Sequence, residues 1–324
     1  MTRVDVLPAR EVPLGGLRAM NVFRALPQRG LPTVGAWCFL DRFGPQHIDM
    51  RVDPHPHIGL QTVTWPLKGE VRHRDSLGSD VVLRAGDLNL MTSGAGIAHS
   101  EYSLPGEGGG APELDAVQFW IALPEGARDG ERDFAQHTDL PRVTLAAEEG
   151  PDADAVVVMG TLAGATSPAR TFTPLVGAQV TIAPGSRLQV PLEADWEHAA
   201  VLLEGDVAVG GPEGVCAVRN DLNYLGAGLD SVELASDTGA VVFLLGGEPL
   251  DEELVMWWNF VGRSHEEIEE AWHGWQSHSA RFGEVAGHGD VRIPAPPLPS
   301  VRLKSRGAPL RRDVRVTGPA EGVS

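Results

Sequence analysis

Two histidines stand two positions apart in the stretch VDPHPHIGLQT, and each follows a proline. The residue before a proline is pushed into extended backbone, so Pro56 holds His55 in that geometry. Side chains at i and i+2 of an extended chain point to the same side, and a proline within such a segment indicates the entry or edge of a strand. His55 and His57 are therefore expected to present two imidazoles on one face, either as metal ligands or as part of a histidine-rich surface loop.

A second pair with the same spacing follows in MTSGAGIAHSEYS, and Gly94 and Gly96 allow a tight turn before it. Three imidazoles and one carboxylate, without a thiolate, suit an octahedral Fe, Mn, Ni or Co ion that keeps open positions. Zinc is less favoured, because four protein ligands close a tetrahedral site. The alternative is a set of unrelated surface residues. The residues predicted to bind one metal ion are His55, His57, His99 and Glu101.

The remaining histidines are less suited to metal binding. His73 alternates with Val71 and Asp75 in GEVRHRD, which leaves its direction open, and a histidine on a strand face is favoured over a fifth ligand. His137 and His198 have no partner at ligand spacing.

Most of the chain has the pattern of short strands. Segments such as LQTVTWPL, DVVLRAGD, AVQFWIALP and AVVVMGTL are rich in β-branched or aromatic residues and are separated by Gly, Pro or Asp. Evenly spaced strands with turn residues between them indicate sandwiches or barrels. One helix is expected in SHEEIEEAWHGWQ, where Ser264 and Glu267 form a capping box and Trp272 and Trp275 belong to the apolar face.

The two halves of the chain repeat one pattern. WPLKGEVRHRD…RAGDLNLMTSGAG in the first half resembles VLLEGDVAVGG…VRNDLNYLGAG in the second, which indicates a duplicated β-domain. Aligning Gly69 with Gly205 places His55 opposite Pro191 and His57 opposite Glu193, so the second copy is expected to lack a metal. The predicted division is a metal-binding domain over 1–135, a second domain over 136–250, and a helix with a Pro-rich tail over 251–324 that packs back across the domains.

Composition limits the possible partners. Lys and Arg number 26 and Asp and Glu number 44, a net charge of −18, which disfavours direct binding to nucleic acid or to anionic membranes. Cys38 and Cys216 form neither a disulfide framework nor a cysteine-based zinc site. The N-terminal residues lack the apolar segment of a signal peptide. We expect a cytoplasmic monomer.

These motifs resemble the pirin family, whose members are bicupins of the cupin superfamily. The resemblance rests on PHPHIGLQTVTWPLKGEVRHRDSLG and GDLNLMTSGAGIAHSE, with support from VQFWIALP and LLGGEPL, and covers roughly residues 15–285. It implies two tandem jelly-roll cupin domains, one mononuclear iron in the first, none in the second, and chain ends that cross between them. The family's usual Arg and Glu are replaced by Ile58 and Gln61, and Gln61 is expected to leave the metal site in place but to alter the surroundings of its ligands. The family's ligand positions match His55, His57, His99 and Glu101.

The resemblance implies two classes of function. One is a quercetin 2,3-dioxygenase type of oxidoreductase, in which O₂ and a small aromatic substrate such as a flavonol meet at Fe(II), and Glu101 takes the flavonol hydroxyl proton. Mn, Ni, Co, Cu and Zn are alternative ions. Trp65, Met91 and Phe119 would line its cavity or belong to the core. The other class is a redox-sensitive regulatory protein that binds a protein partner; a metal protein without turnover is a third reading.

Overall fold

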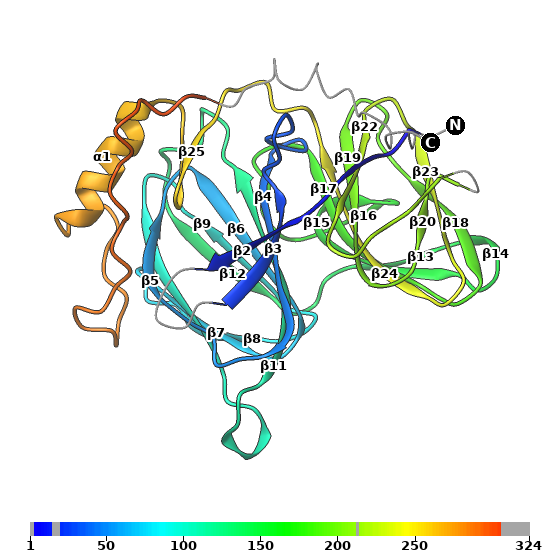
Figure 1. The fold of residues 1–324 in the computed structure, drawn as a ribbon, viewed down its shortest axis with the longest axis horizontal. Helices are drawn as coiled ribbons and strands as arrows, with labels where there is room; N and C mark the ends of the chain where they lie inside the picture. Colours follow the sequence, from blue (N-terminus) through cyan, green and yellow to red (C-terminus); the bar gives the residue numbers. More distant parts are fainter. Residues whose placement is uncertain (1–2, 15–19, 212–213, 306–324) are drawn as a thin grey trace, which may run out of the picture.

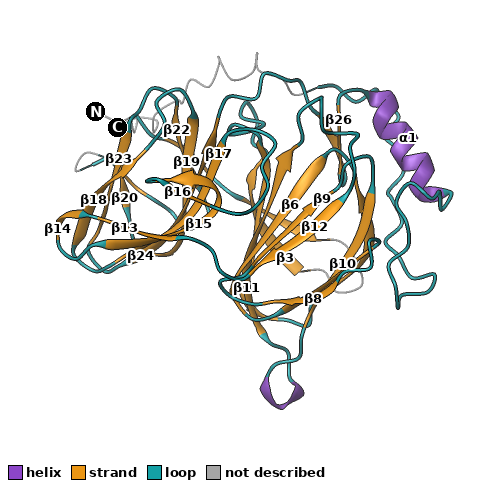
Figure 2. Ribbon diagram, turned by 180° about the vertical axis from the view of Figure 1, so that it is seen from behind, coloured by secondary structure: helices purple, strands orange, loops and turns teal. Residues whose placement is uncertain are grey.

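The computed structural model describes residues 3–14, 20–211 and 214–305. Within these residues the regular structure is almost entirely β-strand, and the strands gather into two lobes that lie side by side (Figure 1). Seen from behind, a single long helix flanks the outer side of the first lobe (Figure 2). The predicted all-β class with a late helix is therefore confirmed. None of the described helices is long and apolar enough to cross a membrane.

The first lobe consists of a large sheet and a small sheet. In the order of its hydrogen-bonded neighbours, the large sheet comprises β12 (Asp133–His137), β9 (Leu88–Thr92), β6 (Leu60–Lys68), β11 (Glu113–Ala122), β4 (Trp37–His47), β3 (Met20–Leu26) and β2 (Arg10–Leu14). In the same order, the small sheet comprises β5 (Arg51–His57), β10 (Ile97–Ser103), β7 (Val71–Asp75) and β8 (Asp80–Leu83). A short 3₁₀ turn, η1 (Glu107–Gly109), precedes β11.

The second lobe repeats this arrangement, again with a large and a small sheet. The large sheet comprises β1 (Asp5–Leu7), β22 (Leu222–Gly226), β19 (Glu197–Gly205), β24 (Ala240–Gly247), β17 (Leu175–Ile182), β15 (Ala153–Leu162) and β13 (Arg142–Leu145), with β16 (Ala165–Thr166) paired to β15. The small sheet comprises β14 (Ala147–Glu149), β18 (Ser186–Pro191), β23 (Ser231–Ser236), β20 (Ala208–Val209) and β21 (Val215–Cys216). Pro191 pairs with Ser231 in this sheet as His55 pairs with His99 in the first lobe, which agrees with the sequence alignment of the halves.

The two large sheets pack against each other and form one apolar core between the lobes. Trp37 and Phe119 meet edge to face with ring centroids 5.2 Å apart, and Phe119 lies 4.4 Å from Phe243 of the second lobe. The first large sheet is therefore covered on both faces, by the second lobe on one side and by its own small sheet on the other. This explains why seven consecutive residues of β6 are buried.

The interiors of the two lobes differ in chemistry. In the second lobe Leu188, Val190, Val232 and Leu234 belong to a single apolar cluster. In the first lobe the corresponding strands β5 and β10 carry buried histidines and a buried glutamate.

The two ends of the chain cross over the lobes. β1 precedes the strands of the first lobe but pairs with β22 of the second lobe. This confirms the crossing that the pirin resemblance implies for the N-terminal end. At the other end, the hairpin of β25 (Val255–Trp257) and β26 (Phe260–Gly262) returns to the first lobe, where Phe260 bridges to Ile58. The domain boundaries at 135 and 250 stay a prediction, and the tail beyond residue 305 lies outside the described residues.

The predicted helix is confirmed as α1 (His265–Gln276). The Ser264 hydroxyl accepts the Glu267 N–H at 3.2 Å, as an N-cap does, while the Glu267 carboxylate accepts the N–H of Arg263 rather than that of Ser264. Trp275 is buried in the cluster that joins the helix to Ile58 and Phe260, whereas Trp272 is only partly covered. The helix thereby fastens the β25–β26 hairpin onto the first lobe.

Candidate metal centre

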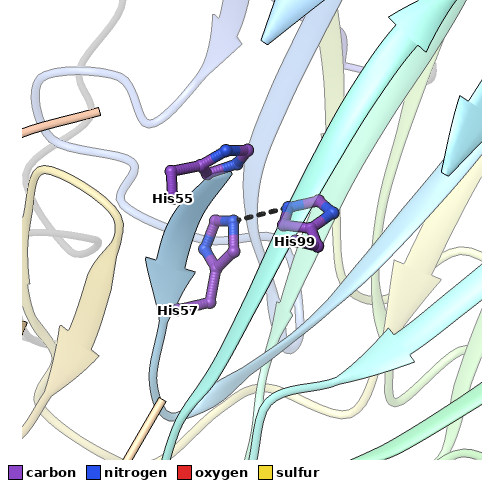
Figure 3. Close-up of side chains that lie close together, drawn as sticks. All are labelled: His55, His57 and His99. Carbon is purple, nitrogen blue, oxygen red and sulfur yellow. Dashed lines mark hydrogen bonds between the residues drawn. The ribbon is translucent and has the colours of Figure 1, made fainter. Parts of the chain in front are cut away.

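The small sheet of the first lobe brings the predicted histidines together. β10 lies between β5 and β7, and its register places His99 opposite His55 on one side and opposite Asp75 on the other. His55 and His57 point inward from β5 toward His99 on β10 (Figure 3). One ring nitrogen from each of the three histidines lies within 4.8 Å of the others, and all three side chains are buried.

Backbone carbonyls set the tautomers of two of these rings. His55 Nδ1 lies 2.9 Å from the carbonyl oxygen of Asp53, and His57 Nδ1 lies 3.1 Å from that of Asn259. A carbonyl only accepts, so each Nδ1 carries the proton and each Nε2 offers a lone pair. His57 Nε2 lies 3.1 Å from His99 Nε2. Asn259 sits in the hairpin turn between β25 and β26, so the far end of the chain orients a residue of β5.

Burial keeps the histidines neutral. It lowers the pKa of His57 and His99 well below the ordinary value, and the neighbouring His55 imidazole lowers both further. Burial also lowers the pKa of His55, although the bond to Asp53 and the charge of Glu101 oppose this. Neutral imidazole is the form that binds a metal.

Glu101 lies in the same interior but groups differently. A carboxylate oxygen of Glu101 lies within 4.8 Å of a ring nitrogen of His99 and of His73. The ring nitrogens of His55, His57 and His99 form a separate group that does not include Glu101. A β-bulge between His99 and Glu101 shifts the register against β5 at this point, and bulges redirect the side chains beside them. Gln118 Nε2 donates to both carboxylate oxygens, at 3.2 and 2.9 Å, and the Thr64 hydroxyl donates to Oε1 at 3.2 Å.

His73 is placed closer to this cluster than the sequence led us to expect. Val71, His73 and Asp75 are buried while Arg72 and Arg74 are less so, which shows that His73 faces the interior. Its Nδ1 lies 3.4 Å from His99 Nδ1, and its ring stacks on Phe134 with centroids 4.4 Å apart. The apolar Val71, two residues before His73 and so on the same face of the strand, was the sequence feature that could have predicted this inward direction.

Gln61 does not line the cluster, contrary to the expectation that it alters the surroundings of the ligands. Gln61 Nε2 donates to Thr92 Oγ1 at 3.0 Å and to the carbonyl of Arg170 at 3.2 Å, on the face of β6 that meets the second lobe. Ile58 packs against Phe260 in the cluster under α1. Gln61 therefore contacts the second lobe, and Ile58 contacts the β25–β26 hairpin.

Of the two readings offered for Trp65 and Phe119, cavity wall or core, the core is the one observed. Trp65 and Phe119 belong to the core between the lobes, and Trp65 Nε1 donates to Gln179 of the second lobe at 2.8 Å. Met91 is buried on β9. Trp120 is the aromatic residue beside the histidines: its ring meets His57 edge to face at 5.2 Å and stacks on Phe39 at 4.0 Å. The buried Trp120 Nε1 has no hydrogen-bond partner among the residues that the structure describes.

The donor set fits a divalent transition metal ion. Two Nε2 lone pairs, of His55 and His57, and the nearby Nε2 of His99 converge in a buried space with a carboxylate beside them. A hydrogen bond between His57 Nε2 and His99 Nε2 would need a proton on one of these atoms and would use only one lone pair. A metal ion would accept both lone pairs. Imidazoles with a carboxylate and no thiolate are ligands of Fe, Ni, Co, Cu or Zn rather than of Ca or Mg.

Comparison with protein families identifies the group to which this fold belongs. The Pirin model matches residues 17–121, which contain the histidine cluster, and the model of the pirin C-terminal cupin domain matches residues 177–283. The chain belongs to the pirin family. Its two lobes are thus two cupin domains, as predicted, and the histidines lie in the first.

Individual pirin relatives align over most of the chain. A Pseudomonas aeruginosa protein named "Putative quercetin 2,3-dioxygenase PA1205" is 44% identical over 295 residues, which are 90% of this chain and 89% of that protein. A pirin-like protein of Caulobacter vibrioides is 34% identical over 90% of this chain and 98% of its own length. The crystal structure of a quercetin 2,3-dioxygenase from Acinetobacter baumannii matches with a TM-score of 0.85 and 35% identity, over 93% of this chain and 97% of that one.

Proposed function

We propose that this pirin is a mononuclear non-haem iron oxidoreductase that cleaves a flavonol such as quercetin with O₂. The observation that carries the proposal is the buried trio of neutral imidazoles His55, His57 and His99 with Glu101 beside it. The Pseudomonas and Acinetobacter relatives, named for quercetin 2,3-dioxygenase activity, supply the substrate class. His55, His57, His99 and Glu101 would hold the ion.

When bound, Fe(II) would polarise the substrate oxygen and bring O₂ to it. The chain's own contribution begins with Glu101. Its carboxylate is positioned to take the proton of a flavonol hydroxyl, because Gln118 and Thr64 hold both of its oxygens by donated hydrogen bonds. The three histidines are uncharged and keep their Nε2 atoms turned into the site.

The rings around the histidines favour a flat aromatic molecule. Trp120 and Phe39 form a stacked pair beside His57, and His73 and Phe134 form a second stacked pair beside His99. Aromatic rings prefer such offset or edge-on neighbours, each worth about 0.5–1.5 kcal/mol beyond the area that they bury. The unpartnered Trp120 N–H is available to donate to an oxygen of the substrate.

Oxygen consumption tests this proposal. Protein loaded with Fe(II) should consume O₂ only when quercetin is present, with both atoms of ¹⁸O₂ found in the product. Glu101→Gln should reduce the rate by about 10²–10⁴-fold, the usual contribution of a general base. Metal content is measured on the same samples, because Glu101 is also proposed as a ligand. Thr64→Val, which removes one hydrogen bond to Glu101 and leaves the carboxylate, should reduce the rate far less.

The contrary result would be full iron occupancy without O₂ uptake on quercetin or any other flavonol. That outcome would reject the enzymatic proposal and favour a regulatory pirin that binds a protein partner.

A further inference from the structure

Beyond the ligands themselves, the interior of the first domain contains a connected row of polar side chains. It runs from Asp75 through His73 to His99, and all three side chains are buried. His73 Nε2 lies 3.3 Å from Asp75 Oδ2, and His73 Nδ1 lies 3.4 Å from His99 Nδ1. His99 Nε2 then faces His57.

We propose that His73 and Asp75 position the ring of His99, by fixing the tautomer in which His99 Nε2 is free to bind the ion. This inference rests on the proposed function, because it takes the ion to lie at the three Nε2 atoms. Histidine ligands usually donate their other N–H to a carboxylate or carbonyl, as His55 and His57 do to the carbonyls of Asp53 and Asn259. His99 has His73 at that position instead of a carbonyl.

The direction of each hydrogen bond follows from Asp75. Its Oδ1 accepts the backbone N–H groups of Leu77 at 2.8 Å and Ser79 at 3.0 Å, so the carboxylate is fixed in orientation with Oδ2 toward His73. An ionised carboxylate only accepts, so His73 carries its proton on Nε2 and its Nδ1 has a lone pair. That lone pair accepts from His99 Nδ1–H, which leaves His99 Nε2 unprotonated.

The chemistry of Asp75 agrees with this assignment. Burial acts to raise its pKa, but the hydrogen bonds from His73 and Ser79 outweigh burial and leave the pKa below the ordinary value. Asp75 is therefore an anion at neutral pH. Its buried neighbour His73 is held in plane by the stack on Phe134, at an interplanar angle of 14°.

Asp75→Asn would reverse the donor and acceptor roles along this row of hydrogen bonds. The side-chain amide oxygen would keep the N–H groups of Leu77 and Ser79, so the amide NH₂ would face His73. His73 would then accept at Nε2 and carry its proton on Nδ1, where it would meet His99 Nδ1–H. His99 could relieve this contact only by moving its own proton to Nε2, the atom needed by the ion. Replacing one carboxylate oxygen by NH₂, at a residue that does not itself bind the ion, should therefore weaken metal binding.

Co(II) affinity and the spectrum of the Co(II) protein test the proposal, with the full chain and Co(II) as the probe. Asp75→Asn and His73→Phe, which keeps the stack on Phe134, should each weaken Co(II) binding about 10–100-fold in competition with a chelator. In proton NMR of the Co(II)-saturated protein, the hyperfine-shifted ring N–H of His99 should be protected from solvent exchange in the wild type and should exchange faster in both variants, because its acceptor is lost. His73→Asn, whose amide oxygen can replace Nδ1 as the acceptor, should bind Co(II) close to the wild-type level. Asp80→Asn is the matched control, because Asp80 lies on the next strand and pairs with exposed Arg72.

Asp75→Asn with wild-type affinity and an unchanged N–H exchange rate would overturn the proposal. So would an equal loss in His73→Asn and His73→Phe, which would make His73 a ligand or a packing residue. These results are separate from the proposed function. A wild type that binds Co(II) with this N–H protected, but turns over no flavonol with Fe(II), would retain the positioning role and reject only the enzyme.

Discussion

The Nε2 atoms of His57 and His99 lie 3.1 Å apart inside the first cupin domain, although 42 residues separate them in the chain. Both imidazoles are neutral, and His57 Nδ1 already donates to the carbonyl of Asn259. The pair therefore presents lone pairs to one point in the interior. The third imidazole, of His55, lies with its ring centroid 4.3 Å from that of His99.

An ion at this point should stabilise the fold. A ligand that binds only the native state adds about 2.7 kcal/mol at a free concentration 100 times its Kd. We expect thermal unfolding of the chelator-treated protein to move to higher temperature when Co(II) or Fe(II) is added. His57→Ala and His99→Ala should abolish this shift, and a shift that persists in both would place the ion elsewhere.

Gln61→Glu, which restores the residue that the pirin pattern usually has, should lower stability and leave the metal in place. The new carboxylate would face the carbonyl of Arg170 without a proton to donate, and a lost buried hydrogen bond costs about 1–3 kcal/mol. Urea unfolding and metal content, measured together, check this. A loss of metal with unchanged stability would show that Gln61 acts on the site after all.

Asp115→Ala should uncouple the two cupin domains. Its carboxylate pairs with both Nε and Nη2 of Arg42, at 2.9 and 2.7 Å, while Arg42 Nη1 donates to Leu203 and Asn220 of the second domain. Both partners are fully buried, so a guanidinium left alone costs about 3–5 kcal/mol. Replacing both residues, as Arg42→Met with Asp115→Leu, should recover much of this loss in urea unfolding. A double variant as unstable as the single would argue against a charge effect.

His198→Asn should reduce the acid sensitivity of the second domain. Burial lowers the pKa of His198 to about 4, against an ordinary value of 6.5. Between these pH values His198 is protonated in the unfolded chain and neutral in the folded one. The contribution of His198 to the free energy of unfolding is therefore fully present above pH 6.5 and is lost as the pH drops from 6.5 toward 4. The variant should lose roughly 2–3 kcal/mol less over this range, measured by urea unfolding at each pH. An unchanged pH dependence would contradict the assignment.

Local patterns predicted that the histidines would lie together, because the relevant rule is local. Two residues at i and i+2 of an extended chain share a face wherever the strand lies, and this put His55 with His57 and required only one turn to bring His99 alongside. The apolar face of α1 and the cap at Ser264 were predictable for the same reason.

What the sequence left open, or predicted wrongly, depended on relationships that no local pattern contains. Because β6 and β11 are buried on both faces, an apolar residue there does not tell which face it occupies, and Trp65 and Phe119 proved to face the second domain. Gln61 faces the same way. The carbonyl of Asn259 reaches His57 from 202 residues away, and the bulge that redirects Glu101 has no marker in the sequence.

Anomalous diffraction from crystals of the metal-loaded protein tests the central claim most directly. Data collected on either side of the metal absorption edge should show one peak per chain, at the point where the Nε2 atoms of His55, His57 and His99 converge, with Glu101 completing the coordination. A peak bound by other residues, or no peak in protein that retains its metal in solution, would contradict the account.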